Sequence, residues 1–138
     1  MAENIINLPV NHKRSLTSTL KVVENLLEEV DDLIKKSGKN LCTEIVKDVD
    51  HATLEHNLKT IEKARVQIRR MTEKYGIVKS TYSLQRIIDY KKSKMWEILC
   101  DANSKKMKGY GDFPKDAIKD FDEDIDQLMA ITQSIKIN

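Results

Sequence analysis

Apolar side chains recur at spacings of three and four residues along most of the chain, which is the period of amphipathic helices. The first such stretch keeps one apolar face, formed by Leu16, Leu20, Val23, Leu27, Val30 and Ile34. Ser15 precedes it as a candidate N-cap, and Gly38 follows it where a helix would end. The spacing therefore predicts a helix between these two residues, with residues 1–14 as an N-terminal tail.

A second helix is predicted to run from near Asn40 to Tyr75. Its early apolar positions lie about a third of a turn away from its later ones, so one straight helix would not keep a single face. The early positions are Ile45, Val49 and Ala52, and the later ones are Ile61, Ala64, Ile68, Met71 and Tyr75. A bend or break between Asp50 and His56 would reconcile them, with Asp50 or Thr53 capping the restarted helix.

Two further helices are predicted after Gly76. The third opens at Ser80 as N-cap, and the fourth opens at Asp112 or Phe113 with Pro114 in its first turn. The third carries the stripe Leu84, Ile88, Met95, Ile98 and Ala102, interrupted by Lys91, and the fourth carries Ile118, Phe121, Ile125, Leu128, Thr132 and Ile135. The sequence therefore predicts an all-α fold, an up-down-up-down four-helix bundle with a long, bent or broken second helix, and a single domain over 15–138.

The amino-acid composition agrees with an all-α fold and also indicates where in the cell the protein resides. The 138 residues are 40% hydrophobic and include only 4 Gly and 2 Pro, which leaves little turn punctuation for a many-stranded sheet. The sequence contains no apolar run long enough to cross a bilayer, and the first residues do not resemble a signal peptide. Cys42 and Cys100 are expected to be reduced thiols, so the sequence indicates a cytoplasmic protein without membrane contact.

Motifs for chemistry are weak. Gly109 and Gly111 end the third helix and lack the spacing of a phosphate-binding loop. One stripe of the second helix, Glu44, Asp48, His51 and Glu55, faintly resembles half of a di-iron site, but no other helix offers a second half. The aspartates over 120–126 lack the Gly and Glu of a calcium loop. No histidine or other general base is placed by the sequence pattern to activate the Cys100 thiol. We therefore expect no catalytic residue, metal or cofactor, with a metal-binding bundle enzyme as the disfavoured alternative.

Charge is distributed unevenly along the chain. Residues 59–108 hold 14 Lys and Arg against 5 Asp and Glu, a net charge of +9, whereas the flanking stretches are acidic. A basic hairpin over 59–108 would bind nucleic acid or another polyanion. The alternative is internal neutralisation, because an acidic fourth helix packed on the third would bring Asp126 level with Lys94.

All seven aromatic residues lie in the second half of the chain. Tyr82 and Trp96 stand fourteen residues apart on the predicted third helix, near the line of Met107 and away from the apolar stripe. This extra apolar surface is explained either by packing against two neighbours or by an interface. The sequence favours a non-enzymatic interaction or regulatory protein that binds a protein partner or itself as a homodimer. Its predicted contact residues are Tyr82, Trp96 and Met107, with Lys105, Lys106 and Lys108 as a basic rim.

Overall fold

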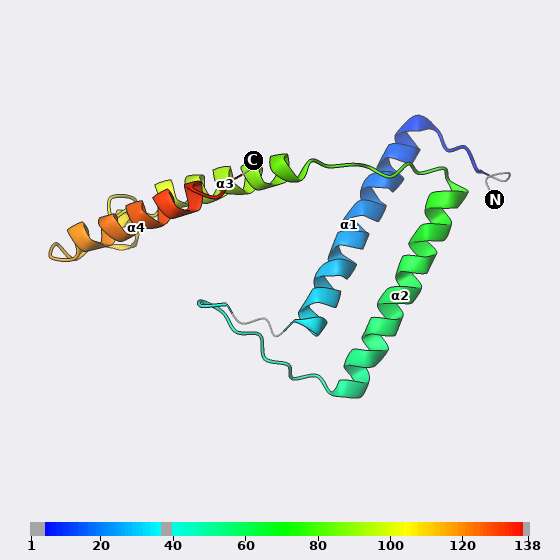
Figure 1. Cartoon of the computed structure of the whole chain (residues 1–138), viewed down its shortest axis with the longest axis horizontal. Helices are drawn as coiled ribbons and strands as arrows, with labels where there is room; N and C mark the ends of the chain where they lie inside the picture. Colours follow the sequence, from blue (N-terminus) through cyan, green and yellow to red (C-terminus); the bar gives the residue numbers. More distant parts are fainter. Residues whose placement is uncertain (1–4, 37–39, 137–138) are drawn as a thin grey trace. The chain divides into compact units, whose positions relative to one another are not determined.

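The computed structural model describes residues 5–36 and 40–136. Within these ranges the chain forms four α-helices and one short 3-10 helix, with no β-strand, so the predicted all-α class is confirmed. The chain divides into two compact units, Met1–Lys79 and Ser80–Asn138, and each contains one pair of packed helices (Figure 1). The single up-down-up-down bundle and the single domain over 15–138 stay predictions.

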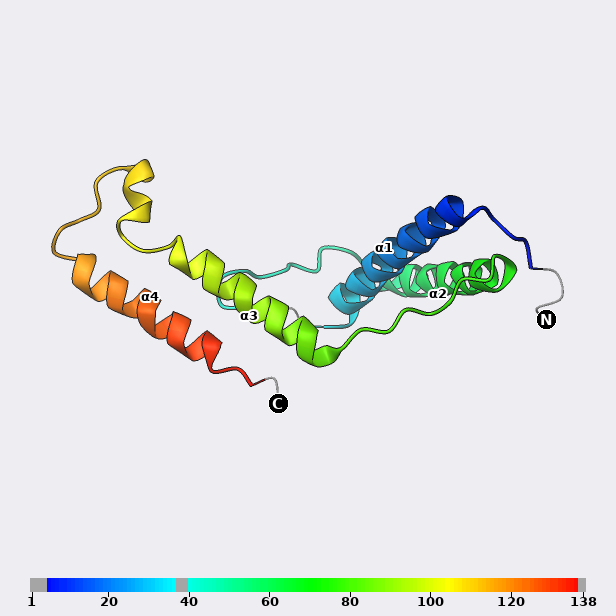
Figure 2. The ribbon, with the colours of Figure 1, turned by 90° about the horizontal axis from the view of Figure 1, so that it is seen from above.

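The first unit is a hairpin of α1 (Val10–Lys35) and α2 (His51–Lys74), which lie side by side in both views (Figures 1 and 2). Leu20 of α1 and Ile61 and Ile68 of α2 are buried between them, each at most 9% exposed. Burying such a side chain stabilises a fold by about 1.5–3 kcal/mol. The apolar side chains of α1 on the side of α2, here called the α1 seam, are Leu16, Leu20, Leu27 and Ile34, all buried or half-buried.

The predicted apolar stripe of α1 is correct for these four residues and wrong for the two valines. Val23 and Val30 are 41% and 45% exposed, because they lie on the flank of the seam and α2 does not reach them. The helix also begins earlier than predicted, at Val10 and not after Ser15. Pro9 ends the tail, and its carbonyl accepts the first helical hydrogen bond from Lys13 at 2.9 Å. The predicted stop at Gly38 lies outside the described residues.

The second helix is shorter than predicted. Residues 40–50 are not helical, and α2 begins at His51 with Asp50 as its N-cap, where the Asp50 carboxylate accepts a 2.7 Å hydrogen bond from the Thr53 amide. This bond lowers the pKa of Asp50, since it stabilises the charged form. The long helix fails because its early apolar residues find no partner: Leu41, Ile45, Val46 and Val49 are all exposed. Lys47 reaches the end of α1, where its Nζ donates to the Ile34 carbonyl at 2.9 Å.

Gly76 ends α2, as the sequence predicts. Its φ of 60° is the left-handed conformation that glycine adopts without strain, and the Ile77 amide donates back to the Thr72 carbonyl at 2.8 Å. The tail returns to the same place, because the Ile6 amide donates to the Lys74 carbonyl at 2.7 Å. The connection to the next helix is longer than the predicted start at Ser80 implies, since residues 77–83 are not helical.

The second unit is a hairpin of α3 (Leu84–Cys100) and α4 (Ile118–Gln133), joined through the 3-10 helix η2 (Lys106–Tyr110) (Figure 2). Ser83, not Ser80, caps α3 by accepting a hydrogen bond from the Arg86 amide at 3.3 Å. The predicted opening of α4 at 112–113 is also wrong. Residues from Pro114 to Ala117 form a turn, closed by a 3.1 Å backbone hydrogen bond, before the helix starts.

Two polar contacts set the register of α3 against α4. Asp122 accepts hydrogen bonds from the amide and the hydroxyl of buried Ser104, both at 2.8 Å. At the other end, the Gln133 side-chain amide donates to the Lys92 carbonyl at 3.0 Å. Lys94 therefore lies level with about residue 131, and not with Asp126 as predicted. The seventeen-residue connection, which includes η2, shifts the register because it is not a simple turn at the glycines.

Candidate interaction surfaces

The α1–α2 hairpin leaves a row of apolar side chains open on α1. We call these residues the α1 row: Val22, Val23, Leu26, Val30 and Leu33. They are between 41% and 57% exposed. At about 100° per residue the middle of the row lies roughly a quarter turn from the middle of the α1 seam, so α2 covers only part of the apolar surface of α1. Val22, Leu26 and Leu33 were not among the predicted apolar positions, although their spacing of four and seven residues is typical of one helix face.

The neighbouring flank of α2 carries no charge either. Since the two helices are antiparallel, one side of α2 adjoins the α1 row. This side of α2 holds uncharged residues. These are Asn57, Thr60, Ala64, Gln67 and Met71. Together with the α1 row they form what we call the uncharged face, which extends along α1 from Ser15 to Leu33; the exposed Glu29, seven residues after Val22, lies at its edge.

The opposite face of the same hairpin is built from charges. Arg65 of α2 lies 2.7 Å from Glu62 and 3.7 Å from Asp31 of α1, and Asp31 also pairs with Lys35 at 3.1 Å. The Glu62 hydrogen bond, with further attraction from Asp31 and Glu28, raises the pKa of Arg65. Asp31 is tolerated as a buried carboxylate because two cations hold it. The hairpin therefore has one charged and one uncharged face.

The α3–α4 hairpin leaves shorter apolar flanks open. On α3 the exposed residues Leu84, Ile87 and Ile98 share a flank with Lys91, which is exposed between them. On α4 the apolar residues Leu128 and Ile131 are exposed, and the exposed Ile135 follows the end of the helix. The predicted α3 stripe is thus correct for Ile88, Met95 and Ala102, which are half-buried, and wrong for the others.

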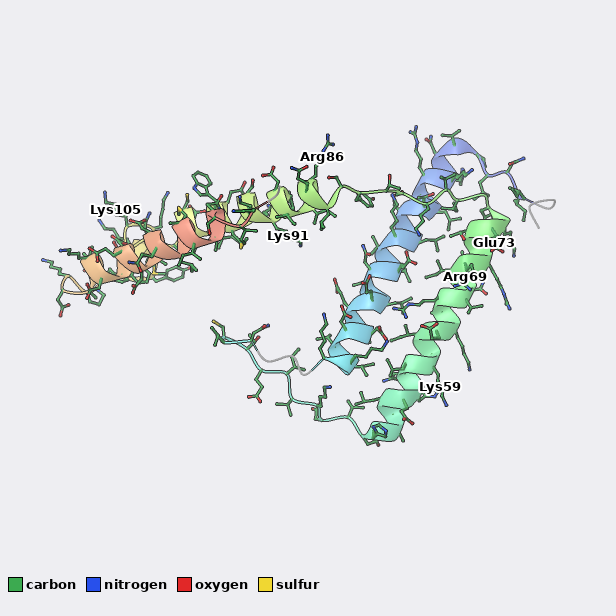
Figure 3. The ribbon with its side chains drawn as sticks, viewed as in Figure 1. Lys59, Arg69, Glu73, Arg86, Lys91 and Lys105 are labelled. Atoms are coloured by element: carbon green, nitrogen blue, oxygen red, sulfur yellow. The ribbon has the colours of Figure 1, made fainter. Side chains whose placement is uncertain are left out.

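The predicted contact residues do not form one line on α3. Tyr82 is 70% exposed but precedes the helix, so the fourteen-residue spacing to Trp96 carries no helical alignment. Trp96 is 49% exposed on the flank of α3 opposite Ile98, and Met107 is half-buried in η2. The basic rim is present on the surface, since Lys105, Lys106 and Lys108 are all exposed, and Figure 3 labels the first of them.

The predicted acid and histidine stripe of the second helix is not assembled. Glu44 and Asp48 belong to the non-helical segment before α2, and only His51 and Glu55 are neighbours, with Nε2 and Oε1 3.1 Å apart and both exposed. Among the described residues no three metal-ligating side chains come together. Both cysteines are free thiols, Cys42 exposed and Cys100 half-buried.

Basic side chains form a row on the outer surface of α2. We call Lys59, Lys63 and Arg70 the α2 basic row; they are spaced by four and seven residues, all exposed, and have no ion-pair partner among the described residues (Figure 3 shows Lys59). The internal neutralisation predicted for the third and fourth helices is not formed, since no ion pair of the described chain joins α3 to α4. The basic segment 59–108 also spans both units, with α2 packed on α1 and α3 on α4.

Comparisons with models of known protein families, with curated proteins and with solved structures find no match to this chain. No helix in the described ranges has the length and apolarity needed to cross a membrane.

Proposed function

We propose that this chain is a non-enzymatic interaction protein, which binds another protein chain through apolar helix surfaces that its hairpins leave open. The observation that supports this most is the uncharged face of the α1–α2 hairpin. A hairpin that needs no partner has one apolar seam between its helices and polar or charged residues elsewhere. A contiguous uncharged surface with exposed valine and leucine is typical of a binding surface.

The surface around Trp96, with Met107 and the basic rim of Lys105, Lys106 and Lys108, is proposed as a second contact region of the same function. Half-exposed tryptophan contributes strongly where it becomes buried in a complex. A cytoplasmic location belongs to this proposal and is supported by the two free thiols.

Site-specific photo-crosslinking in cells tests the proposal. A benzophenone side chain in place of Leu26, in the α1 row, is expected to give a covalent adduct with a protein, whereas the same group in place of Lys63 on the outer side of α2 is expected to give little. Adding Val30→Lys should remove the Leu26 adduct, because a lysine in the row would have to be buried without a partner. Equal adducts from both positions, or none from Leu26, would refute this function.

A second candidate function is polyanion binding, and the α2 basic row favours it because its three cations are not engaged in ion pairs. Lys63→Glu combined with Arg70→Glu is expected to weaken binding of a fluorescent single-stranded RNA of about 20 nucleotides at least tenfold, and to make the dependence of log K on log salt concentration shallower by about 1–2. Lys115→Glu with Lys119→Glu changes the charge equally at two exposed positions and serves as control. An equal loss of RNA affinity in both double variants, or an affinity that does not change with salt concentration, would eliminate this candidate.

A further inference from the structure

We propose that a second copy of this chain covers the uncharged face of the α1–α2 hairpin, so that two hairpins stack into a four-helix bundle across a two-fold axis. The inference rests on the proposed function, since it names the partner for that surface. Three features support it: the heptad pattern of α1, the absence of charge on the face, and its size.

The pattern of α1 is that of a helix with two neighbours. Val23, Leu26, Val30 and Leu33 follow the three-four spacing of the a and d positions of a heptad, and the seam residues Leu20, Leu27 and Ile34 occupy the e positions of the same frame. Three apolar positions in seven are typical of core-facing helices in bundles, whereas a single seam needs two. The hairpin supplies α2 as the neighbour for the e positions. The a and d positions therefore lack one neighbour within the hairpin.

Charge favours a second copy as that neighbour. When an uncharged face meets its own copy, no charged group is enclosed within it, and Glu29 at its edge stays next to water. The exposed flank of α3 is a poorer cover, because it would bring Lys91 against valine and leucine side chains. The charged face with Arg65 and Glu62 stays in water in this arrangement.

The size of the face is sufficient for a reversible dimer. From Ser15 to Leu33 the helix rises about 27 Å. Two packed helices are about 18 Å wide, so each copy offers on the order of 500 Å², and the pair about 1,000 Å². This is the lower limit for specific interfaces, and we expect a dimer that dissociates on dilution through the micromolar range.

Sedimentation equilibrium on the full chain tests the proposal, with Val23→Lys and Val66→Lys as matched variants. Both valines are 41% exposed, but Val23 belongs to the α1 row and Val66 faces outward from α2. We expect the unaltered chain and Val66→Lys to dimerise alike, and Val23→Lys to raise the dissociation constant at least 100-fold with unchanged helical circular dichroism. Gln67→Lys adds the same charge on the α2 side of the uncharged face, next to the control position, and should also weaken the dimer.

If Val23→Lys loses helical signal, the comparison of Gln67→Lys with Val66→Lys decides, because both positions are exposed and outside the seam. An unaltered chain that stays monomeric at 100 µM, or dimers equally strong in all variants, would overturn the second copy as partner. If the chain is monomeric but the benzophenone at position 26 still gives an adduct with a different protein, the proposed function stands and only the second copy as partner is refuted. If no adduct forms, both proposals are refuted.

Discussion

Replacing Ile61 by alanine is expected to lower the free energy of unfolding of the α1–α2 hairpin by about 2–5 kcal/mol, the usual loss for an isoleucine truncated in a packed interior. Ile61 is 5% exposed, and only Leu20 and Ile68 are comparably buried apolar residues in the described chain. With so few buried side chains, a cavity at this position removes a large share of the hydrophobic stabilisation. Urea unfolding followed by circular dichroism at one fixed protein concentration measures the change.

Val66→Ala is the control, because it lies on the same helix and is 41% exposed. It should change the free energy by about 0.5 kcal/mol or less. Equal losses at the two positions would mean that α1 does not cover Ile61, and that the seam is placed wrongly.

Replacing Asp122 by alanine is expected to lower the stability of the α3–α4 hairpin by about 2–3 kcal/mol. The carboxylate accepts hydrogen bonds from both the amide and the hydroxyl of Ser104, and Ser104 is 4% exposed, so two buried donors would lose their acceptor. The same contact joins α4 to the end of the connection from α3. We therefore expect weakened protection from hydrogen exchange over 101–117 as well as a lower urea midpoint.

Two further variants make this test specific. Asp124→Ala removes an exposed carboxylate of the same helix and should leave the midpoint nearly unchanged. Asp122→Asn should retain part of the stability, since an amide side chain accepts from the Ser104 amide and donates to its hydroxyl. A result in which Asp122→Ala resembles Asp124→Ala would show that the register of α3 and α4 is not held by this contact.

The helices and the α1 seam were predictable because they depend on the spacing of apolar residues, which can be read directly from the sequence. The ends of the helices were harder to predict. Ser15 and Ser80 are good N-caps by residue type, but Pro9 and Ser83 precede the first turns, and the choice depends on which side chain or carbonyl meets the first amides. Residues 40–50 have helical spacing too, but they form no helix because no other element covers their apolar side chains.

The interaction surfaces could be predicted only in part. Trp96 is exposed, as its position away from the apolar stripe suggested, but the alignment with Tyr82 depended on a helix start that is wrong by three residues. The α1 row was not predicted as a separate surface, because the spacing of Val23 and Val30 also fits a single seam against one partner helix. A heptad frame separates most of the two sets. Leu20, Leu27 and Ile34 of the seam occupy e positions, and Val23, Leu26, Val30 and Leu33 of the row occupy a and d positions. Leu16 of the seam (a) and Val22 of the row (g) are the exceptions. The register of α3 and α4 depended on η2, which glycine positions alone do not predict.

The most direct test of the central claim is the mass of the unaltered chain in solution, measured by sedimentation equilibrium from about 1 to 100 µM, the range in which an interface near 1,000 Å² is expected to dissociate. If the uncharged face binds a second copy, the mass should rise with concentration from 15.9 kDa toward twice that value and level off there. A constant 15.9 kDa over the whole range would contradict the claim.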